Sequence, residues 1–193
     1  MPPHTLPLLL AFLAPCTALK LSVQLGRREA VAAAAAAAVL PRSASAGLKP
    51  CPGGANNCWS TAGPGKNELA KWAFPAGASK SAAAASLREV VEAYPQAGQA
   101  GVDLGGWALA DGSLADGTYA RYEFKSGIGN FAKFFNGGKP FVDDLELSVE
   151  DGFACVRSSS RVGDSDLGVN AKRINYIAAG LRAKGWDAPG VPQ

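Results

Sequence analysis

Histidine is almost missing from this sequence of 193 residues, and the only one, His4, stands near the amino terminus. The chain from Gly47 onward therefore has no imidazole, which excludes Ser-His-Asp and Cys-His catalysis and every metal site built on histidine. Carboxylate and Ser-Lys chemistry remain open. We expect no catalytic residue of a histidine-dependent kind, no metal and no cofactor in this part of the chain.

Net charge is missing from the same part of the chain. Four of the 19 Lys and Arg residues and one of the 16 Asp and Glu residues precede Gly47, which leaves 15 of each sign after it. A neutral domain offers no electrostatic reason to bind nucleic acid or an anionic membrane surface. We expect neither as a partner.

No hydrophobic run is long enough to cross a bilayer, although two shorter ones stand near the amino terminus. The first, Leu6–Leu13, leads to small residues ending at Ala18, as in a secretory signal peptide. The second follows Arg27 and Arg28 and leads to small residues ending at Ala46, as in a twin-arginine signal. Its apolar stretch of about eleven residues is shorter than the roughly 20 that a membrane helix needs.

Two stacked signals indicate passage across more than one membrane. We interpret residues 1–18 as a signal peptide, 19–46 as a transit remnant with a thylakoid-transfer signal, and 47–193 as one mature domain. Cleavage is expected after Ala18 and after Ala46. The arrangement predicts delivery to the thylakoid lumen of a complex plastid, as in an alga, with no transmembrane span in the mature form. A primary plastid with an unusual transit peptide is the alternative.

Hydrophobic periodicity predicts an α+β domain, a small antiparallel sheet of three to five strands with two helices packed on one face. The expected helices are Ser79–Tyr94 and about Asn170–Lys184, and the expected strands are Thr118–Lys125, Val142–Val149 and Phe153–Arg161. Leu69–Phe74 or Gly106–Ala110 could extend the sheet, and residues 47–66 are expected to form an ordered loop or extended segment.

Asp151-Gly152 between two expected strands predicts a hairpin turn. A two-residue turn would place Val149 opposite Ala154 and Glu146 opposite Arg157, whereas a three-residue turn would shift this pairing by one. We favour the two-residue turn because it gives Arg157 an acidic neighbour.

The connection Gly127–Pro140 contains a G-x-G-x-x-A pattern, but glycines and a proline follow too soon for the crossover helix of a dinucleotide site. We interpret it as a loop packed on its own phenylalanines, Phe131, Phe134 and Phe135.

Three cysteines follow residue 46. Cys51 and Cys58 stand close together in a loop and are expected to form a disulfide in an oxidising compartment. Cys155 lies in the middle of a predicted strand, where we expect a small buried hydrophobic residue rather than a nucleophile or a third metal ligand.

Two stretches resemble a known family. The first is a C-P-x4-N-C-x-S pattern from Cys51 to Ser60, and the second runs from Val142 to Ile174 and ends in R-S-x-S-R-x-G-x-x-D-x-G-x-N-x-x-R-I. Together they resemble the domain of unknown function 1499 (DUF1499) family, in the form found in plastids, over most of Gly47–Leu181. Trp59 departs from the smaller apolar residue expected there. The resemblance implies a fold and a constellation of residues without an activity.

The second stretch holds the candidate site residues. They are polar or charged and stand near one strand end and one helix start: Asp143, Asp144, Arg157, Ser160, Arg161, Asp166, Asn170 and Arg173. One interpretation is an anion site formed by guanidinium groups and a helix amino terminus. The other, which we favour, is a structural polar network in which Asp143 or Asp144 pairs with Arg161, Asn170 caps the last helix and Asp166 holds the turn.

Three functional hypotheses follow. The first is a non-enzymatic binding or assembly factor for a photosystem or another thylakoid complex. The second is a binding module for a small anionic or amphipathic ligand at the arginines. The third is a hydrolase that uses carboxylates or a Ser-Lys pair. A calcium-binding loop is not expected, because the acidic residues do not have the spacing of an EF-hand.

Overall fold

A computed structural model describes residues 47–127 and 134–192 of the chain. The two predicted signals lie outside the described residues, with Arg27, Arg28 and both cleavage sites, Ala18 and Ala46. Most of the predicted G-x-G-x-x-A pattern, including Phe131, also lies outside them.

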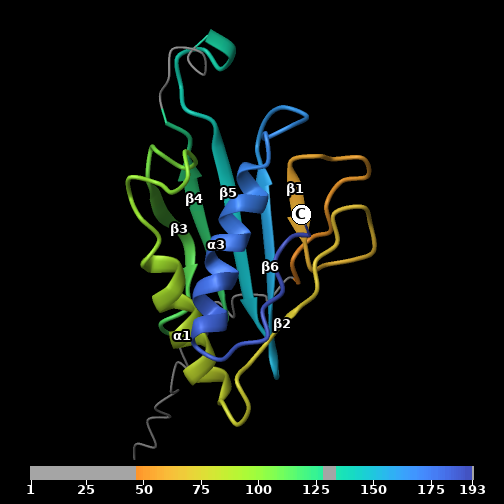
Figure 1. Ribbon diagram of the computed structural model, residues 1–193, viewed down its shortest axis with the longest axis vertical. Coiled ribbons are helices and arrows are strands. Elements are labelled where there is room, and N and C mark those ends of the chain that lie inside the picture. The colour runs from red at the N-terminus through yellow and green to blue at the C-terminus, as the bar shows by residue number, and fades with distance from the viewer. Residues whose placement is uncertain (1–46, 128–133, 193) are drawn as a thin grey trace, which may run out of the picture. The chain divides into compact units, whose positions relative to one another are not determined.

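One antiparallel sheet organises the described residues (Figure 1). Its strands in sheet order are β1 (Cys58–Ser60), β6 (Phe153–Ser160), β5 (Val142–Val149), β4 (Tyr119–Lys125) and β3 (Trp107–Ser113), and β2 (Trp72–Ala73) also pairs with β6. The expected α+β class is confirmed. The sheet has six strands rather than three to five, because β1 and β2 both pair along the same edge of β6.

The three strands predicted from alternation are present within one residue of their expected ends. Both proposed extensions also exist, as β2 and β3. In β4 and β5 alternate side chains are buried, and Tyr122, Phe124, Leu145 and Leu147, which have no exposed surface, lie on the helix-covered face. Alternation therefore predicted the inner face of the sheet correctly.

The hairpin between β5 and β6 has the register favoured from the sequence. Val149 lies opposite Ala154, and Glu146 lies opposite Arg157. Gly152 takes a φ of 88°, a backbone conformation that a turn of this kind requires and that glycine adopts without a steric penalty.

Helices α1 (Lys80–Glu92) and α3 (Val169–Ala183) cover the same face of the sheet (Figure 1). The Ser79 hydroxyl caps α1 by accepting a hydrogen bond from the Ala82 amide at 3.2 Å. Beyond α3, Gly185 takes a φ of 83° and donates to the Arg182 carbonyl, as expected for the residue after a helix.

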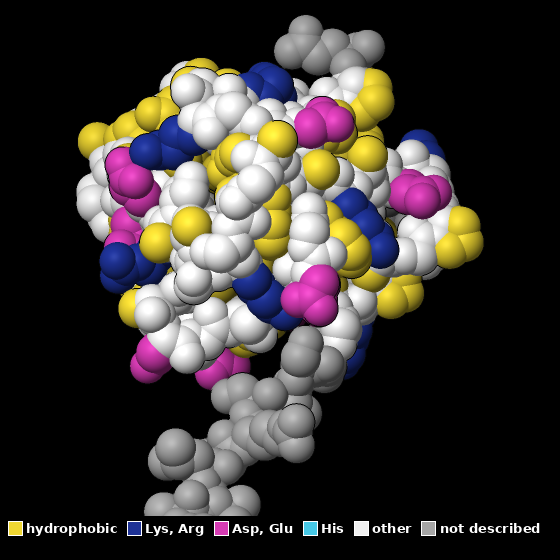
Figure 2. Space-filling model, turned by 90° about the horizontal axis from the view of Figure 1, so that it is seen from below, with side chains coloured by type: hydrophobic (Ala, Val, Ile, Leu, Met, Phe, Trp, Pro, Cys, Tyr) yellow, Lys and Arg dark blue, Asp and Glu magenta, His cyan; other side chains and the backbone are white. Residues whose placement is uncertain are grey.

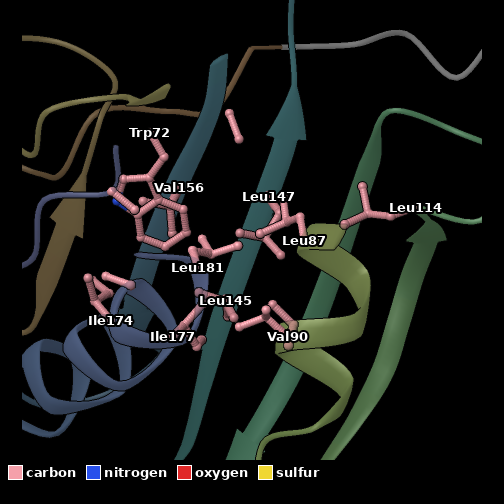
Figure 3. Packing of buried hydrophobic residues seen from close by; sticks show 14 of the residues in the cluster. Trp72, Leu87, Val90, Leu114, Leu145, Leu147, Val156, Ile174, Ile177 and Leu181 are labelled. Carbon is pink, nitrogen blue, oxygen red and sulfur yellow. The ribbon is translucent and has the colours of Figure 1, made fainter. Parts of the chain in front are cut away.

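The hydrophobic core lies between the two helices and the sheet (Figure 3). Leu87 of α1, Leu145 and Leu147 of β5, and Ile177 and Leu181 of α3 have no exposed surface. Burial of side chains of this size stabilises a fold by about 1.5–3 kcal/mol each. These contacts fix the helices against the sheet and so form the rigid frame that positions the loops at the strand ends.

Charges on the end of the sheet seen in Figure 2 are mixed, with Lys and Arg side chains interspersed among Asp and Glu and no field of one sign. This agrees with the balanced composition after residue 46. Neither α1 nor α3 has the length and hydropathy needed to cross a membrane.

Two expectations about individual side chains are wrong. Phe134 and Phe135 do not pack beneath their loop; they are 83% and 62% exposed, and their rings contact each other edge to face with centroids 5.4 Å apart. Cys155 is half-buried rather than buried, because it points to the sheet face that the helices leave open.

Candidate functional site

The predicted site residues do not form one cluster, because the sheet separates them. Side chains alternate along a strand, so Asp143 faces the helices while Asp144 faces the opposite side. In β6 the same alternation turns Ser160 inward and Arg157 outward. The result is two separate polar networks, one on each face of the sheet.

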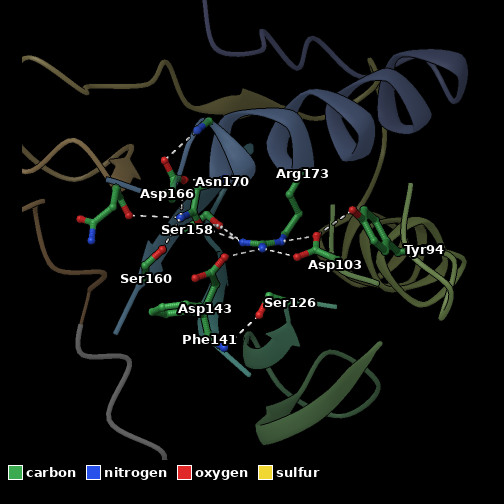
Figure 4. Close-up of polar contacts among 12 residues, drawn as sticks. Tyr94, Asp103, Ser126, Phe141, Asp143, Ser158, Ser160, Asp166, Asn170 and Arg173 are labelled. Carbon is green, nitrogen blue, oxygen red and sulfur yellow. Dashed lines mark hydrogen bonds and ion pairs between the residues drawn. The ribbon is translucent and has the colours of Figure 1, made fainter. Parts of the chain in front are cut away.

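Arg173 is the centre of the inner network and has no exposed surface (Figure 4). Its guanidinium donates to Asp103 Oδ2 at 2.8 Å, Asp143 Oδ2 at 2.6 Å and Ser158 Oγ at 2.9 Å. It also lies 4.5 Å from the Phe124 ring centroid. Burial acts to lower the pKa of Arg173, but the hydrogen bonds and charges of the two carboxylates outweigh it, so the pKa is raised.

Asp103, an ion-pair partner of Arg173, was not predicted from the sequence. It lies in the loop before β3 with a φ of 55°, a conformation that Asp tolerates better than most residues. Its Oδ2 also accepts a hydrogen bond of 2.7 Å from the Tyr94 hydroxyl, whose pKa is raised first by burial and then by this carboxylate. Asp103 thereby ties the end of α1 to α3.

The N-cap residue of α3 is Gly168 rather than Asn170, and Asp166 holds the turn before it. The Asp166 carboxylate accepts from the Gly168 amide at 3.0 Å and from the Asn170 amide at 2.7 Å. The Asn170 side chain is fully buried, lies within hydrogen-bonding distance of the Asn57 carbonyl and Ser160 Oγ, and accepts from Ser158 Oγ at 2.6 Å. The expected cap is therefore a bridge between β6, α3 and the disulfide loop.

The outer network contains the remaining arginines. Arg161 donates to both Asp144 oxygens at 2.9 and 2.8 Å and also pairs with Glu123. Arg157 pairs with Glu146 at 2.6 Å, as the hairpin register implied. Of the two acidic partners proposed for Arg161, Asp144 is the one that it contacts. The charge of each arginine is thus matched by a carboxylate of this chain.

Acid should weaken the outer network. Burial acts to raise the pKa of Asp144, but Arg161 and Arg121 outweigh it, so the folded pKa is lowered. A carboxyl group with a lowered folded pKa stabilises the fold above its unfolded pKa of about 4, and this contribution is lost as the pH falls through the folded value. Asp144→Asn should therefore lower the free energy of unfolding by about 1 kcal/mol near neutral pH and by much less at about pH 2, measured by urea denaturation.

The exposed Asp116 provides the control for this experiment. Asp116→Asn should change the free energy of unfolding by less than about 0.5 kcal/mol at either pH. An Asp144→Asn effect of equal size at both pH values would show that the carboxylate charge is not what stabilises the network.

An open groove lies above the inner network, at the sheet end where β4 and β6 finish and β5 begins. It has a volume of about 1210 Å³. We call it the loop groove and define it by its lining segments, which lie within residues 101–104, 126–127, 135–143 and 160–169. Gly127 permits two of them to meet, because a Cβ there would lie 2.7 Å from the Leu104 Cβ.

The lining of the loop groove is mainly apolar. Its large side chains are Leu104, Phe135, Phe141, Val162 and Leu167. Its polar residues include Asp143, Ser160 and Asp166, so the inner network forms part of its surface. Exposed apolar side chains gathered around a concave site are typical of a binding surface.

Leu167 is held in an unfavourable backbone conformation at this groove. Its φ is 53° and its side chain is 88% exposed. The left-handed region costs a residue with a Cβ roughly 1–2 kcal/mol, and such strain concentrates at functional sites. Neither burial nor packing within the described residues accounts for a leucine at this position.

Among the residues that the structure describes, no group of three or more His, Cys, Asp or Glu side chains could hold a metal ion. The predicted disulfide between Cys51 and Cys58 is present, with Cα atoms 5.7 Å apart. The neighbouring Asn57 donates to the Gly163 carbonyl at 2.6 Å, which connects the disulfide loop to one wall of the loop groove.

Comparison with known proteins gives one match. The family described as "Protein of unknown function (DUF1499)" matches residues 47–181. No curated protein and no solved structure is found to match the chain. The matched region contains both networks and every segment of the loop groove.

Proposed function

The chain belongs to the DUF1499 family, whose description states no function, and from this premise we propose that it is a non-catalytic binding protein whose ligand lies in the loop groove. The main observation behind this proposal is the groove itself, which has a volume of about 1210 Å³, mainly apolar walls and a polar floor. Sites for small molecules are concave, mostly apolar and supplied with a few polar groups, and typically measure about 300–1,000 Å³. The loop groove is slightly larger than this range and has the same composition.

The conformation of Leu167 supports a binding role. An exposed leucine at positive φ costs free energy in the isolated protein. A ligand with an apolar body would cover this side chain and recover about 25 cal/mol for each Å² of apolar surface removed from water. Phe135 and Val162 would add to this gain, since both are exposed and line the same groove.

The contacts of the floor residues support binding rather than turnover. Ser158 donates to the Asn170 carboxamide and accepts from Arg173. A carboxamide is not a general base, and a guanidinium does not take up a proton, so neither partner activates the hydroxyl as a nucleophile. The Asp103 carboxylate is occupied by Arg173 and Tyr94 in the same way.

A role with a photosynthetic complex is the second candidate, and the two stacked signals before Gly47 motivate it. In this proposal the protein resides in the thylakoid lumen of a complex plastid and assists a photosystem or another thylakoid complex. Blue-native fractionation of thylakoids tests the proposal: the protein should migrate with a photosynthetic complex. Migration solely as a free monomer, with the photosystems intact, would contradict it.

Leu167→Asn should weaken ligand binding without destabilising the fold. Asparagine adopts positive φ more readily than leucine, so the free energy of unfolding should stay within about 1 kcal/mol of the original or rise. A neutral probe with an apolar chain, such as decanol, should bind about tenfold more weakly, a loss of about 1.4 kcal/mol, measured by calorimetric titration.

Leu109→Asn is the matched control, because Leu109 is 45% exposed on β3 and does not line the loop groove. It should leave decanol binding unchanged. If the original protein and Leu167→Asn bind decanol equally well, the loop groove is not the binding site.

A further inference from the structure

The polar end of the loop groove holds a carboxylate oxygen that accepts no hydrogen bond from the described residues. Asp143 is only 7% exposed and lines the groove. Its Oδ2 accepts from Arg173, whereas no described residue donates a hydrogen bond to its Oδ1. Figure 4 shows this second oxygen turned away from Arg173. This oxygen can accept a hydrogen bond from a ligand in the groove, and covering it with a ligand that has no donor would be costly.

The groups around Asp143 extend this acceptor surface. Ser160 lies directly opposite Asp143 on the neighbouring strand, which places their Cβ atoms about 4.5–5.5 Å apart. The Asn170 carboxamide connects Ser160 to Asp166, the next carboxylate along the groove. Asp143, Ser160 and Asp166 therefore all present acceptor oxygens at the polar part of the groove lining.

The charge of this region is negative. Asp103, Asp143 and Asp166 face a single cation, Arg173, which is fully buried. No Lys or Arg is found among the described residues that line the loop groove. An anionic head would meet unpaired carboxylate charge there, while the guanidinium of Arg173 already has its partners. The groove therefore favours a cationic ligand, the opposite of the anionic ligand that the arginines in the sequence suggested.

We propose that the loop groove binds an amphipathic molecule with a positively charged, hydrogen-bond-donating head, such as a primary ammonium on an apolar body. The inference rests on the proposed function and specifies the ligand class for the same groove. The ammonium donates to Asp143 Oδ1 and Ser160 Oγ, and the apolar body lies along Leu167, Leu104 and Phe135. A charged hydrogen bond to a partly desolvated carboxylate is stronger than a neutral one, so the head contributes to affinity as well as to orientation.

Three probes of equal chain length separate this inference from the proposed function. Decylammonium and decanoate are titrated into the purified protein below their micelle concentrations, and decanol below its solubility limit. Decylammonium should bind at least about tenfold more tightly than decanol, decanoate should bind most weakly, and added salt should weaken decylammonium alone. Equal or tighter binding of decanoate would overturn the inference while leaving the groove as a binding site. No binding of any probe would overturn the proposed function as well.

Asp143→Asn tests the residue that carries the selectivity. The variant should bind decylammonium within about threefold of decanol, so the preference for the charged head is lost. Asp151→Asn, at the exposed turn between β5 and β6, is the matched control and should retain the full preference for decylammonium. Unchanged selectivity in Asp143→Asn would contradict the inference. If that variant does not fold, the three-probe comparison and its salt dependence decide the matter on the original protein.

Discussion

Arg173→Met is expected to lower the free energy of unfolding by about 3–5 kcal/mol. The substitution fills much of the same space but leaves Asp103 and Asp143 without their common cation in a region where they are 2% and 7% exposed. Small domains are stable by only about 5–15 kcal/mol, so the variant should unfold at much lower urea concentrations or fail to accumulate. Urea denaturation followed by circular dichroism measures the effect.

Arg161→Met is the matched control, because Arg161 belongs to the same stretch of sequence but is paired at the surface. It should cost less than about 1 kcal/mol. A second comparison uses Arg173→Met combined with Asp103→Asn and Asp143→Asn, which removes the uncompensated charges and should recover part of the lost stability. If Arg173→Met costs no more than Arg161→Met, the inner network is not what holds α3 against the sheet.

Loss of the disulfide is expected to have the second-largest effect, about 2–3 kcal/mol in free energy of unfolding. Replacing Cys51 and Cys58 together by alanine removes a constraint on the unfolded chain. It should also loosen Asn57, which contacts Asn170 and Gly163, and so reduce decanol binding in the loop groove. Denaturation with and without a reductant measures the first effect, and calorimetric titration the second.

Cys155→Ala is the control for this experiment, because Cys155 is unpaired and half-buried. It should change the free energy of unfolding by less than about 1 kcal/mol, and reductant should not alter its behaviour further. If reductant leaves the stability of the original protein unchanged, the disulfide does not constrain the fold as described.

Local patterns were sufficient for most of the fold. Alternation in β4 and β5 predicted which side chains face the core, and Asp151-Gly152 together with the charge of Arg157 predicted the hairpin register. The short strand β1 was missed, because three residues are too few to show a period. It forms by pairing with β6, a contact between residues about a hundred positions apart that no local pattern encodes.

The candidate site was predicted in composition but not in arrangement. Extending the apolar stripe of α3 backward by one turn from Ile174 and Ile177 leads to Asn170 and Arg173, so their burial could have been predicted from helical spacing. The separation of Asp143 from Asp144 likewise follows from alternation. Asp103 could not be found in this way, because it comes from a loop and reaches Arg173 only through the tertiary fold.

The loop groove had no signal in the sequence. Its walls come from separate loops that meet only when the strands are aligned. Phe135 was assigned to a packed loop, because an apolar residue in a connection more often covers a core than lines an open surface. The positive φ of Leu167 is equally invisible in the sequence, since leucine is not a residue that normally adopts it.

The most direct test of the binding site is a titration of the isotope-labelled protein with decylammonium, followed by backbone amide NMR. Our account predicts that the shifted amide signals belong to residues 101–104 and 160–169, while the amides around Arg157 and Glu146 on the opposite sheet face stay in place. Shifts centred on the outer arginines, or no shifts at saturating probe, would contradict it.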